Sequence, residues 1–243
     1  MEATAEFIVD RFNDTGVAGL VLGDRDTVLG LEQLKKLHSR ANFPFLTANL
    51  VGAKTGKPVF DERTIVKVDG VNVGLFGVTM PQAARPGPKG EPPPWRVDNP
   101  IAVANKQVRA LQAEGVDLIV ALAHLPKQQL ETLAKEVPGI TAVMGGNGVR
   151  MLNHPDRYNN TYVCEAHSKG KYLSVLTLHI WPEKGPKGVY ADRYRGEGLQ
   201  RDLQQKAARL ASYERLLERK LEEEKIRAES GETSPTKPGL SLI

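Results

Sequence analysis

Between residues 101 and 148 the sequence alternates stretches of helical period with short apolar runs. The spacing of apolar residues predicts a helix over 101–114, and the run 116–123 predicts a strand that is buried on both faces. A helix over 126–136 and a strand over 140–144 repeat the unit. This rhythm favours a parallel sheet covered by helices, and it places the chain in the α/β class.

The first 80 residues continue the alternation and add a hairpin. The dipeptide Asp69-Gly70 lies between two β-branched runs, Thr64–Val68 and Val71–Val78, and it predicts a two-residue turn between antiparallel strands. The apolar pattern elsewhere predicts a helix ending near residue 13, a strand over 17–22, a helix over 31–37 and a strand over 43–48.

Proline sets the next stretch apart, because residues 81 to 100 contain seven of the sixteen prolines. Proline fixes φ and has no backbone N–H, so this segment predicts an excursion loop and excludes helix or inner strand. After residue 148 the sequence predicts strands near 161–166, 172–181 and 189–193, which give the domain a more antiparallel end.

A long charged helix is predicted over residues 197–228, following a domain that spans 1–195. Its eight basic and seven acidic residues are interleaved, as is typical of a solvated helix. One apolar seam has alternating spacings of four and three, interrupted by Glu214: Leu203, Ala207, Leu210, Leu217 and Leu221. This helix either packs on its own domain or pairs with another helix in a homo- or hetero-oligomer. Residues 229–243 are predicted to be a disordered tail.

Composition excludes several classes of protein. The chain has 33 basic and 29 acidic residues, a net charge of +4, and it has no basic stripe interleaved with aromatics, which argues against nucleic-acid binding. No apolar run approaches the ~20 residues that span a bilayer. Cys164 is the only cysteine, so an internal disulfide and a multi-cysteine zinc site are excluded. If Met1 is the true start, the absence of a signal segment predicts a cytoplasmic protein, whereas an upstream signal would direct it to the periplasm or outside the cell.

Polar side chains follow directly after three of the predicted strands: Asp24, His124 and Asn147. In open α/β sheets functional groups gather at the carboxyl ends of strands, so we expect these three to be neighbours along one edge. A carboxylate, an imidazole and an amide converging there are able to ligate a divalent metal ion. The alternative is purely structural, because Asp24 and Asp26 are also good N-terminal residues for a following helix. The other histidines, of which His38 lies on a predicted helix, are interpreted as surface or hydrogen-bonded residues.

Six segments in order carry a resemblance to a known family: Gly23–Gly30, Phe43–Leu50, Val73–Thr79, Val116–Leu125, Ile140–Val149 and Tyr162–Leu178. In that order they resemble the Gly-Asn-His-Glu-Phe-Asp-x-Gly signature, the FPxLSAN phrase, a following strand, the DxIIxLSH strand, the GGHSH segment and the GxYLGxLxL strands. These belong to the 5′-nucleotidase branch of the calcineurin-like metallophosphoesterases. The resemblance implies a layered α/β sandwich, here without the family's first strands, which carry an Asp-x-His pair and a Gly-Asp pair.

The resemblance also implies a two-metal phosphomonoesterase that acts on nucleotides or similar phosphate esters, with Mn, Zn, Mg or Co as the divalent ion. Carried over by position, Asp24, His124 and Asn147 are the implied metal ligands. Arg25 replaces the family's catalytic histidine and is able to hold a phosphate by paired hydrogen bonds, although it cannot shuttle protons. Val149 replaces a histidine ligand and cannot bind metal.

Two hypotheses follow. In the first, the chain is a divergent phosphoesterase whose activity is impaired or lost. If the activity is lost, the extreme case is a chain that binds no metal ion. In the second, it is a non-catalytic binding or assembly module that keeps the phosphoesterase scaffold and uses the 197–228 helix as a partner surface.

Overall fold

The computed structural model describes residues 2–81, 92–147, 152, 154–166, 172–178 and 193–229. It divides into two compact units between Tyr190 and Ala191. The first unit contains a mixed sheet with helices packed on it, and the described part of the second is a single helix. The predicted α/β class and the C-terminal helix are both confirmed.

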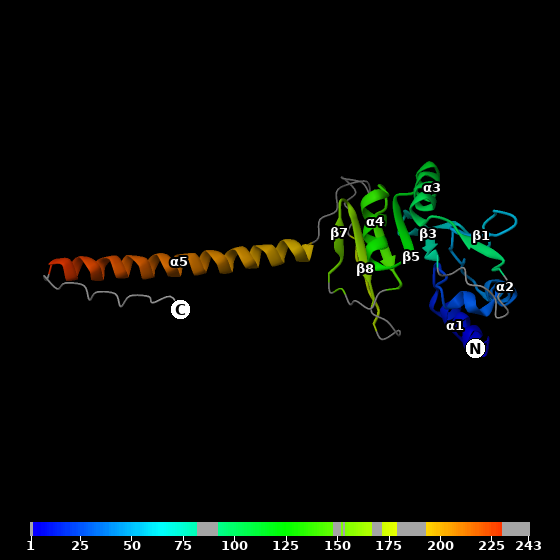
Figure 1. Cartoon of the computed structure of the whole chain (residues 1–243), viewed down its shortest axis with the longest axis horizontal. Helices are drawn as coiled ribbons and strands as arrows, with labels where there is room; N and C mark the ends of the chain where they lie inside the picture. Colours follow the sequence, from blue (N-terminus) through cyan, green and yellow to red (C-terminus); the bar gives the residue numbers. More distant parts are fainter. Residues whose placement is uncertain are drawn as a thin grey trace, which may run out of the picture. The chain divides into compact units, whose positions relative to one another are not determined.

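The main sheet has the strand order β2-β3-β5-β6-β8-β7 over the described residues (Figure 1). Its strands are β2 (Arg63–Val68), β3 (Val71–Thr79), β5 (Leu118–His124), β6 (Ala142–Gly145), β7 (Asp156–Tyr158) and β8 (Thr161–Glu165). The four inner strands are parallel, and the two edge strands pair antiparallel to their neighbours. Because the inner strands are parallel, their carboxyl ends lie along one edge of the sheet.

The crossovers between the parallel strands are the helices α3 (Pro100–Ala113) and α4 (Lys127–Glu136). The side chain of Asn99 accepts hydrogen bonds from two backbone N–H groups in the first turn of α3, where Pro100 needs none. Leu111 of α3 and Leu133 of α4 are fully buried in the core that these helices form with the sheet.

The side chains of β5 alternate between the two faces of the main sheet. Ala121 and Ala123 belong to the core beneath α3 and α4. Leu122 and His124 point to the opposite face, because side chains alternate along a strand. On that face residues 17–23 run close to β5: a Cβ added to Gly19 would lie 3.7 Å from Leu122 Cδ1.

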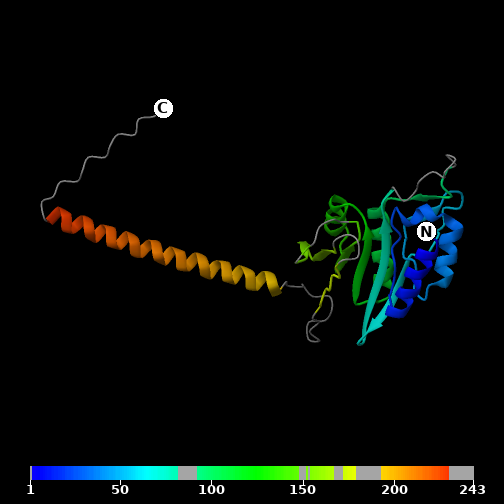
Figure 2. The ribbon, with the colours of Figure 1, turned by 90° about the horizontal axis from the view of Figure 1, so that it is seen from below.

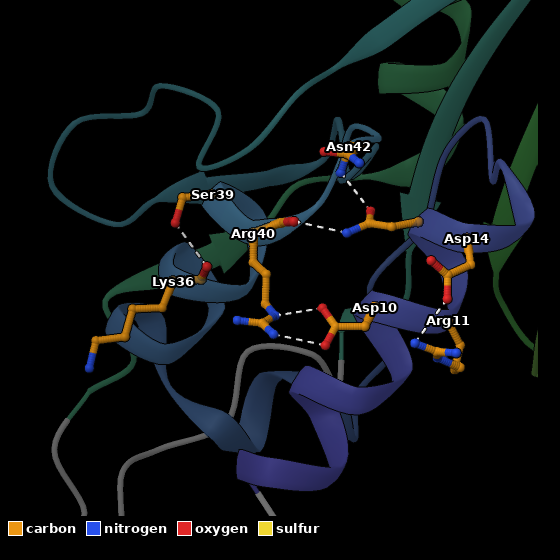
Figure 3. A network of polar contacts seen from close by, with 8 residues as sticks. Asp10, Arg11, Asp14, Lys36, Ser39, Arg40 and Asn42 are labelled. Atoms are coloured by element: carbon orange, nitrogen blue, oxygen red, sulfur yellow. Dashed lines mark hydrogen bonds and ion pairs between the residues drawn. The ribbon is translucent and has the colours of Figure 1, made fainter.

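A second apolar core joins α1 (Glu2–Thr15) and α2 (Leu31–Arg40), which Figure 2 shows side by side, with the segment around Phe43 and Phe45. Arg40 ties the two helices together through paired hydrogen bonds of 2.7 and 2.8 Å to the carboxylate of Asp10 (Figure 3). Asn13 extends the network by donating to the backbone carbonyl of Arg40 at 3.0 Å.

The hairpin is confirmed with the turn chemistry that its sequence predicts. Asp69 and Gly70 have φ angles of 49° and 85°, as a two-residue turn with two left-handed positions requires. The strands on either side of it pair from Val68 opposite Val71 to Arg63 opposite Phe76.

The predictions of strands over 17–22 and 43–48 are wrong. The two segments share only a single parallel bridge, between Leu20 and Phe45. Pro44 has no N–H to donate, and the backbone N–H of Leu22 donates to the Thr47 hydroxyl at 3.2 Å instead of to a neighbouring backbone. A side chain therefore replaces the next bond of the ladder.

The predicted excursion loop over 81–100 is also partly wrong. Residues 82–91 lie outside the described residues, but β4 (Trp95–Val97) pairs antiparallel with β1 (Leu50–Gly52), and Pro100 begins α3. Trp95 is 3% exposed, and its burial draws the segment into a ladder despite the neighbouring prolines. The pairing is compatible with proline because this strand is not inside the main sheet.

Farther along, the strand predicted near 161–166 is confirmed as β8, whereas residues 172–178 form no strand and the rest of the 172–181 prediction lies outside the described residues. Of the predicted strand over 189–193, Arg193 instead begins α5 (Arg193–Glu229), and the remainder is not described. Glu229 ends this helix instead of opening the tail, and residues 230–243 lie outside the described residues. Within the described residues no helix has the length and apolarity needed to cross a membrane.

Candidate functional site

Asp24 and His124 meet at the carboxyl edge of the main sheet. His124 is the last residue of β5, and its Nε2 atom lies 3.1 Å from Oδ1 of Asp24. The side chains are 16% and 18% exposed, so both are shielded by protein but still open to solvent. The fold thus brings together an imidazole and a carboxylate that are 100 positions apart in the sequence.

Glycine makes this contact possible. A Cβ added to Gly23 would lie 2.8 Å from Cε1 of His124 and 3.1 Å from each ring nitrogen, so the imidazole lies directly against the Gly23 backbone. A Cβ added to Gly146, in the loop after β6, would lie 3.8 Å from Nδ1 of the same ring, which is an ordinary contact distance. A hydrogen bond of 3.0 Å from Gly146 N–H to the Ala123 carbonyl holds that loop against the end of β5.

The loop that carries Asp24 is ordered by its own side chains. Asp26 accepts a 2.7 Å hydrogen bond from Gly23 N–H, and the Thr27 hydroxyl donates to the Asp24 carbonyl at 2.9 Å. A short 3-10 helix, η1 (Asp26–Leu29), follows, and Arg25 occupies its N-cap without a capping side-chain bond. Asp24 therefore does not cap this helix: its carboxylate is directed at His124.

Asn147 lies near the same edge but contacts a different group. Its amide nitrogen is 4.0 Å from the sulfur of Met80, the residue after β3. The last residue of β3, Thr79, is aligned with His124 in the register of the sheet. Gly148 and Val149 lie outside the described residues, and Arg25 is exposed beside Asp24.

Sequence reasoning missed Asn49, whose side chain holds the end of β3 by hydrogen bonds. Asn49 is fully buried, and its side chain both accepts from Thr79 N–H and donates to the Thr79 carbonyl, each at 2.8 Å. The same amide donates to the Asp98 carbonyl at 3.1 Å. The available signal was an asparagine inside the largely apolar segment Phe43–Leu50, because a buried amide needs hydrogen-bond partners.

Glu165 was missed as well. It is the last residue of β8, it is 2% exposed, and it is aligned with Gly145 in the register. It therefore brings a second carboxylate to the carboxyl edge of the sheet. The signal was the same one that singled out His124, a polar residue at the end of a buried strand.

His38 is confirmed as a satisfied residue. Its Nε2 lies 2.8 Å from Oδ2 of Asp61, and its ring packs against Phe45 and Phe60. This second histidine–aspartate pair is 35% and 44% exposed. It provides a natural internal control for the first.

The separation of Asp24 and His124 suits two ligands of one metal ion. Donor atoms that are each about 2.1 Å from an ion and at about a right angle lie about 3 Å apart, close to the observed contact. Among the described residues, however, no group of three or more His, Cys, Asp or Glu side chains is placed to hold a metal. The described part of the site thus fits a fragment of a metal centre, and it does not fit a complete binuclear one.

No family model matches the chain, but it is similar to curated proteins and to solved structures. Over 144 residues the chain is 32% identical to a 2′,3′-cyclic-nucleotide 2′-phosphodiesterase/3′-nucleotidase of Yersinia enterocolitica, covering 52% of this chain and 22% of that protein. Over 188 residues it is 26% identical to a 5′-nucleotidase of Vibrio parahaemolyticus, covering 65% of this chain and 34% of that protein. The chain therefore spans about a fifth to a third of the length of these relatives.

The solved structure of the calcineurin-like phosphoesterase YfkN from Bacillus subtilis matches with a TM-score of 0.57 and 24% identity, covering 66% of this chain and 57% of that one. The fold is thus that of the calcineurin-like metallophosphoesterases. Within this class the sequence relatives are nucleotidases, so the resemblance to the 5′-nucleotidase branch is confirmed.

Proposed function

We propose that this chain is a divergent module of the 5′-nucleotidase lineage that binds a divalent cation through Asp24 and His124. We further propose that it binds phosphomonoesters such as nucleotides at the same edge and hydrolyses them weakly or not at all. The observation that carries the proposal is the 3.1 Å contact between the Asp24 carboxylate and the His124 imidazole at the carboxyl edge of a phosphoesterase sheet.

The proposed roles follow from the chemistry of each side chain. Asp24 supplies a negative oxygen ligand, and His124 supplies a nitrogen ligand whose position is fixed by the Gly23 backbone. A bound divalent ion would neutralise charge on phosphate oxygens and lower the pKa of a bound water. Arg25, exposed beside Asp24, is suited to hold phosphate oxygens by paired hydrogen bonds.

We expect weak hydrolysis because the described residues at this edge include few metal ligands and no evident proton donor for the leaving group. Two-metal phosphoesterases use two ions to stabilise both the attacking and the leaving oxygen, and each ion needs its own ligands. Asp24 and His124 are too few for two ions. The guanidinium of Arg25 is also unsuited to donating a proton to the leaving oxygen as a histidine does.

The test combines binding and turnover. The full chain would be titrated with a nucleoside 5′-monophosphate by calorimetry, with and without Mn²⁺, and assayed with a chromogenic phosphate ester. We expect nucleotide binding that depends on Mn²⁺, is lost in His124→Gln and persists in His38→Gln, with turnover no higher than in His124→Gln.

Two results would contradict the proposal in different ways. Absence of Mn²⁺-dependent nucleotide binding would rule out the binding role. Substantial turnover that disappears in His124→Gln would establish an active hydrolase and overturn the expectation of weak activity.

A second candidate function, a non-catalytic assembly module, is favoured by one specific observation. Leu203, Leu210, Leu217 and Leu221 of α5 are each more than half exposed. Apolar residues in such a row indicate a surface that associates with another helix.

A further inference from the structure

Four of the exposed leucines of α5 lie on one stripe, here called the α5 seam. Leu203, Leu210, Leu217 and Leu221 are 58%, 60%, 61% and 51% exposed, and Ala207 lies on the same stripe. Their spacings of four and three residues are those with which one helix packs along another. With 37 residues, α5 is about 55 Å long at ~1.5 Å per residue, enough for several turns of such packing.

We infer that α5 pairs antiparallel with α5 of a second copy of this chain. This inference is independent of the proposed function at Asp24 and His124. It rests on three features of α5 itself: the seam, the distribution of charge along the helix, and the position of the one acidic residue that interrupts the seam.

Charge along α5 is unequal between its halves. Residues 193–211 contain five basic and two acidic residues, a net charge of +3, whereas residues 212–229 contain five basic and six acidic residues, a net charge of −1. A parallel pair would place one +3 half against the other. An antiparallel pair places each positive half against a negative one, and complementary charge fixes the orientation of paired helices.

The position of Glu214 also favours the antiparallel orientation. In a parallel pair in register, Glu214 would face the partner's Glu214, placing two like charges inside an apolar seam. In an antiparallel pair centred on Ser212, Glu214 faces the partner's Leu210. The carboxylate then meets no like charge across the seam.

That single register also matches the rest of the seam. Leu203 faces the partner's Leu221, and Ala207 faces the partner's Leu217. By the two-fold symmetry each contact occurs twice, so every seam residue has a counterpart on the other helix. The alanine opposite the leucine also allows the two helices to approach closely at that layer.

The oligomeric state of the full chain tests the pairing. Sedimentation equilibrium is expected to give twice the 26.6 kDa mass of one chain, with dissociation on dilution. Leu210→Glu is expected to give the monomer mass at every concentration. Leu216→Glu is the matched control, because Leu216 is an exposed leucine of α5, at 49%, that lies off the seam.

Engineered cysteines test the orientation, because the natural Cys164 is buried. Chains carrying Leu203→Cys, mixed with chains carrying Leu221→Cys and oxidised, are expected to form the mixed disulfide dimer in preference to either symmetric one. Preferred cross-linking of Leu203→Cys to itself would show a parallel pair and overturn the proposed orientation.

The pairing itself would be overturned by a monomer mass for the unaltered chain at its highest soluble concentration. That result would be expected if α5 packed on its own first unit or bound a different protein. Equal dissociation of Leu216→Glu and Leu210→Glu would also contradict it, because the seam would then have no special role. Circular dichroism of each variant would establish that α5 is still helical.

Discussion

The imidazole of His124 lies against the backbone of Gly23 so closely that a Cβ at position 23 would come within 2.8 Å of Cε1. Gly23→Ala is therefore expected to displace the ring from Asp24, and to lower the free energy of unfolding by about 1–3 kcal/mol, as overpacking does. Urea denaturation measures the loss. Gly146→Ala is the control, because its Cβ would make an ordinary 3.8 Å contact with the same ring. Equal stability of the two variants would show that the close approach has no energetic consequence.

Asn49 holds the end of β3 in place. Asn49→Ala would leave the backbone N–H and carbonyl of Thr79 and the carbonyl of Asp98 without their side-chain partner. We expect the free energy of unfolding to fall by about 3 kcal/mol, because buried polar groups would lose their hydrogen bonds. Chemical denaturation gives the value, and Asn105→Ala, which removes one bond to the Ile101 carbonyl, should cost about 1 kcal/mol. A similar cost for both would contradict the role assigned to Asn49.

The ion pair between α1 and α2 predicts an acid-dependent loss of stability. The hydrogen bond from the Arg40 guanidinium lowers the pKa of Asp10 below its ordinary value of 3.8. A carboxyl whose pKa is lower in the folded state stabilises the fold above the unfolded-state pKa, and this contribution disappears as the pH falls through the folded value. Asp10→Asn should therefore be less stable than the unaltered chain at neutral pH, with the difference vanishing in strong acid.

Thermal unfolding at a series of pH values measures that difference. Asp14→Asn is the control, since Asp14 pairs with Arg11 on the same helix and does not join α1 to α2. A constant difference between the Asp10→Asn variant and the unaltered chain across the acid range would show that the ion pair is not its source.

Cys164 is expected to be unreactive in the folded protein. Burial raises the pKa of its thiol to about 11, so almost none of it is thiolate at pH 8, and the thiolate is the reactive form. A colourimetric thiol reagent should therefore react slowly until denaturant is added. Reaction at the rate of an exposed cysteine would contradict the burial of β8.

The parts of the fold that were predictable are those that local sequence determines. The Asp69-Gly70 turn needs only its own two residues, and β5, α3 and α4 follow from apolar spacing within one segment. The segments 17–22 and 43–48 could not be assigned in this way, because the Thr47 hydroxyl, which is distant in sequence, replaces a ladder bond at Leu22.

The residues of the candidate site also differ in whether local sequence could predict them. The rule that polar residues follow strand ends identified Asp24 and His124, and the fold brings those two into contact. It did not identify Asn49, whose partners, Thr79 and Asp98, lie 30 and 49 positions away. Nor could it show that the Asn147 amide is directed at Met80, since that depends on how the loops after β3 and β6 meet.

The most direct test of the central claim, that Asp24 and His124 form a cation site, is calorimetric titration of the full chain with Mn²⁺. We expect uptake of one ion per chain, weakened about tenfold or more in Asp24→Asn and in His124→Gln. Uptake should be unchanged in His38→Gln, which alters the other histidine–aspartate pair. No uptake at millimolar Mn²⁺, or equal uptake by all four proteins, would contradict it.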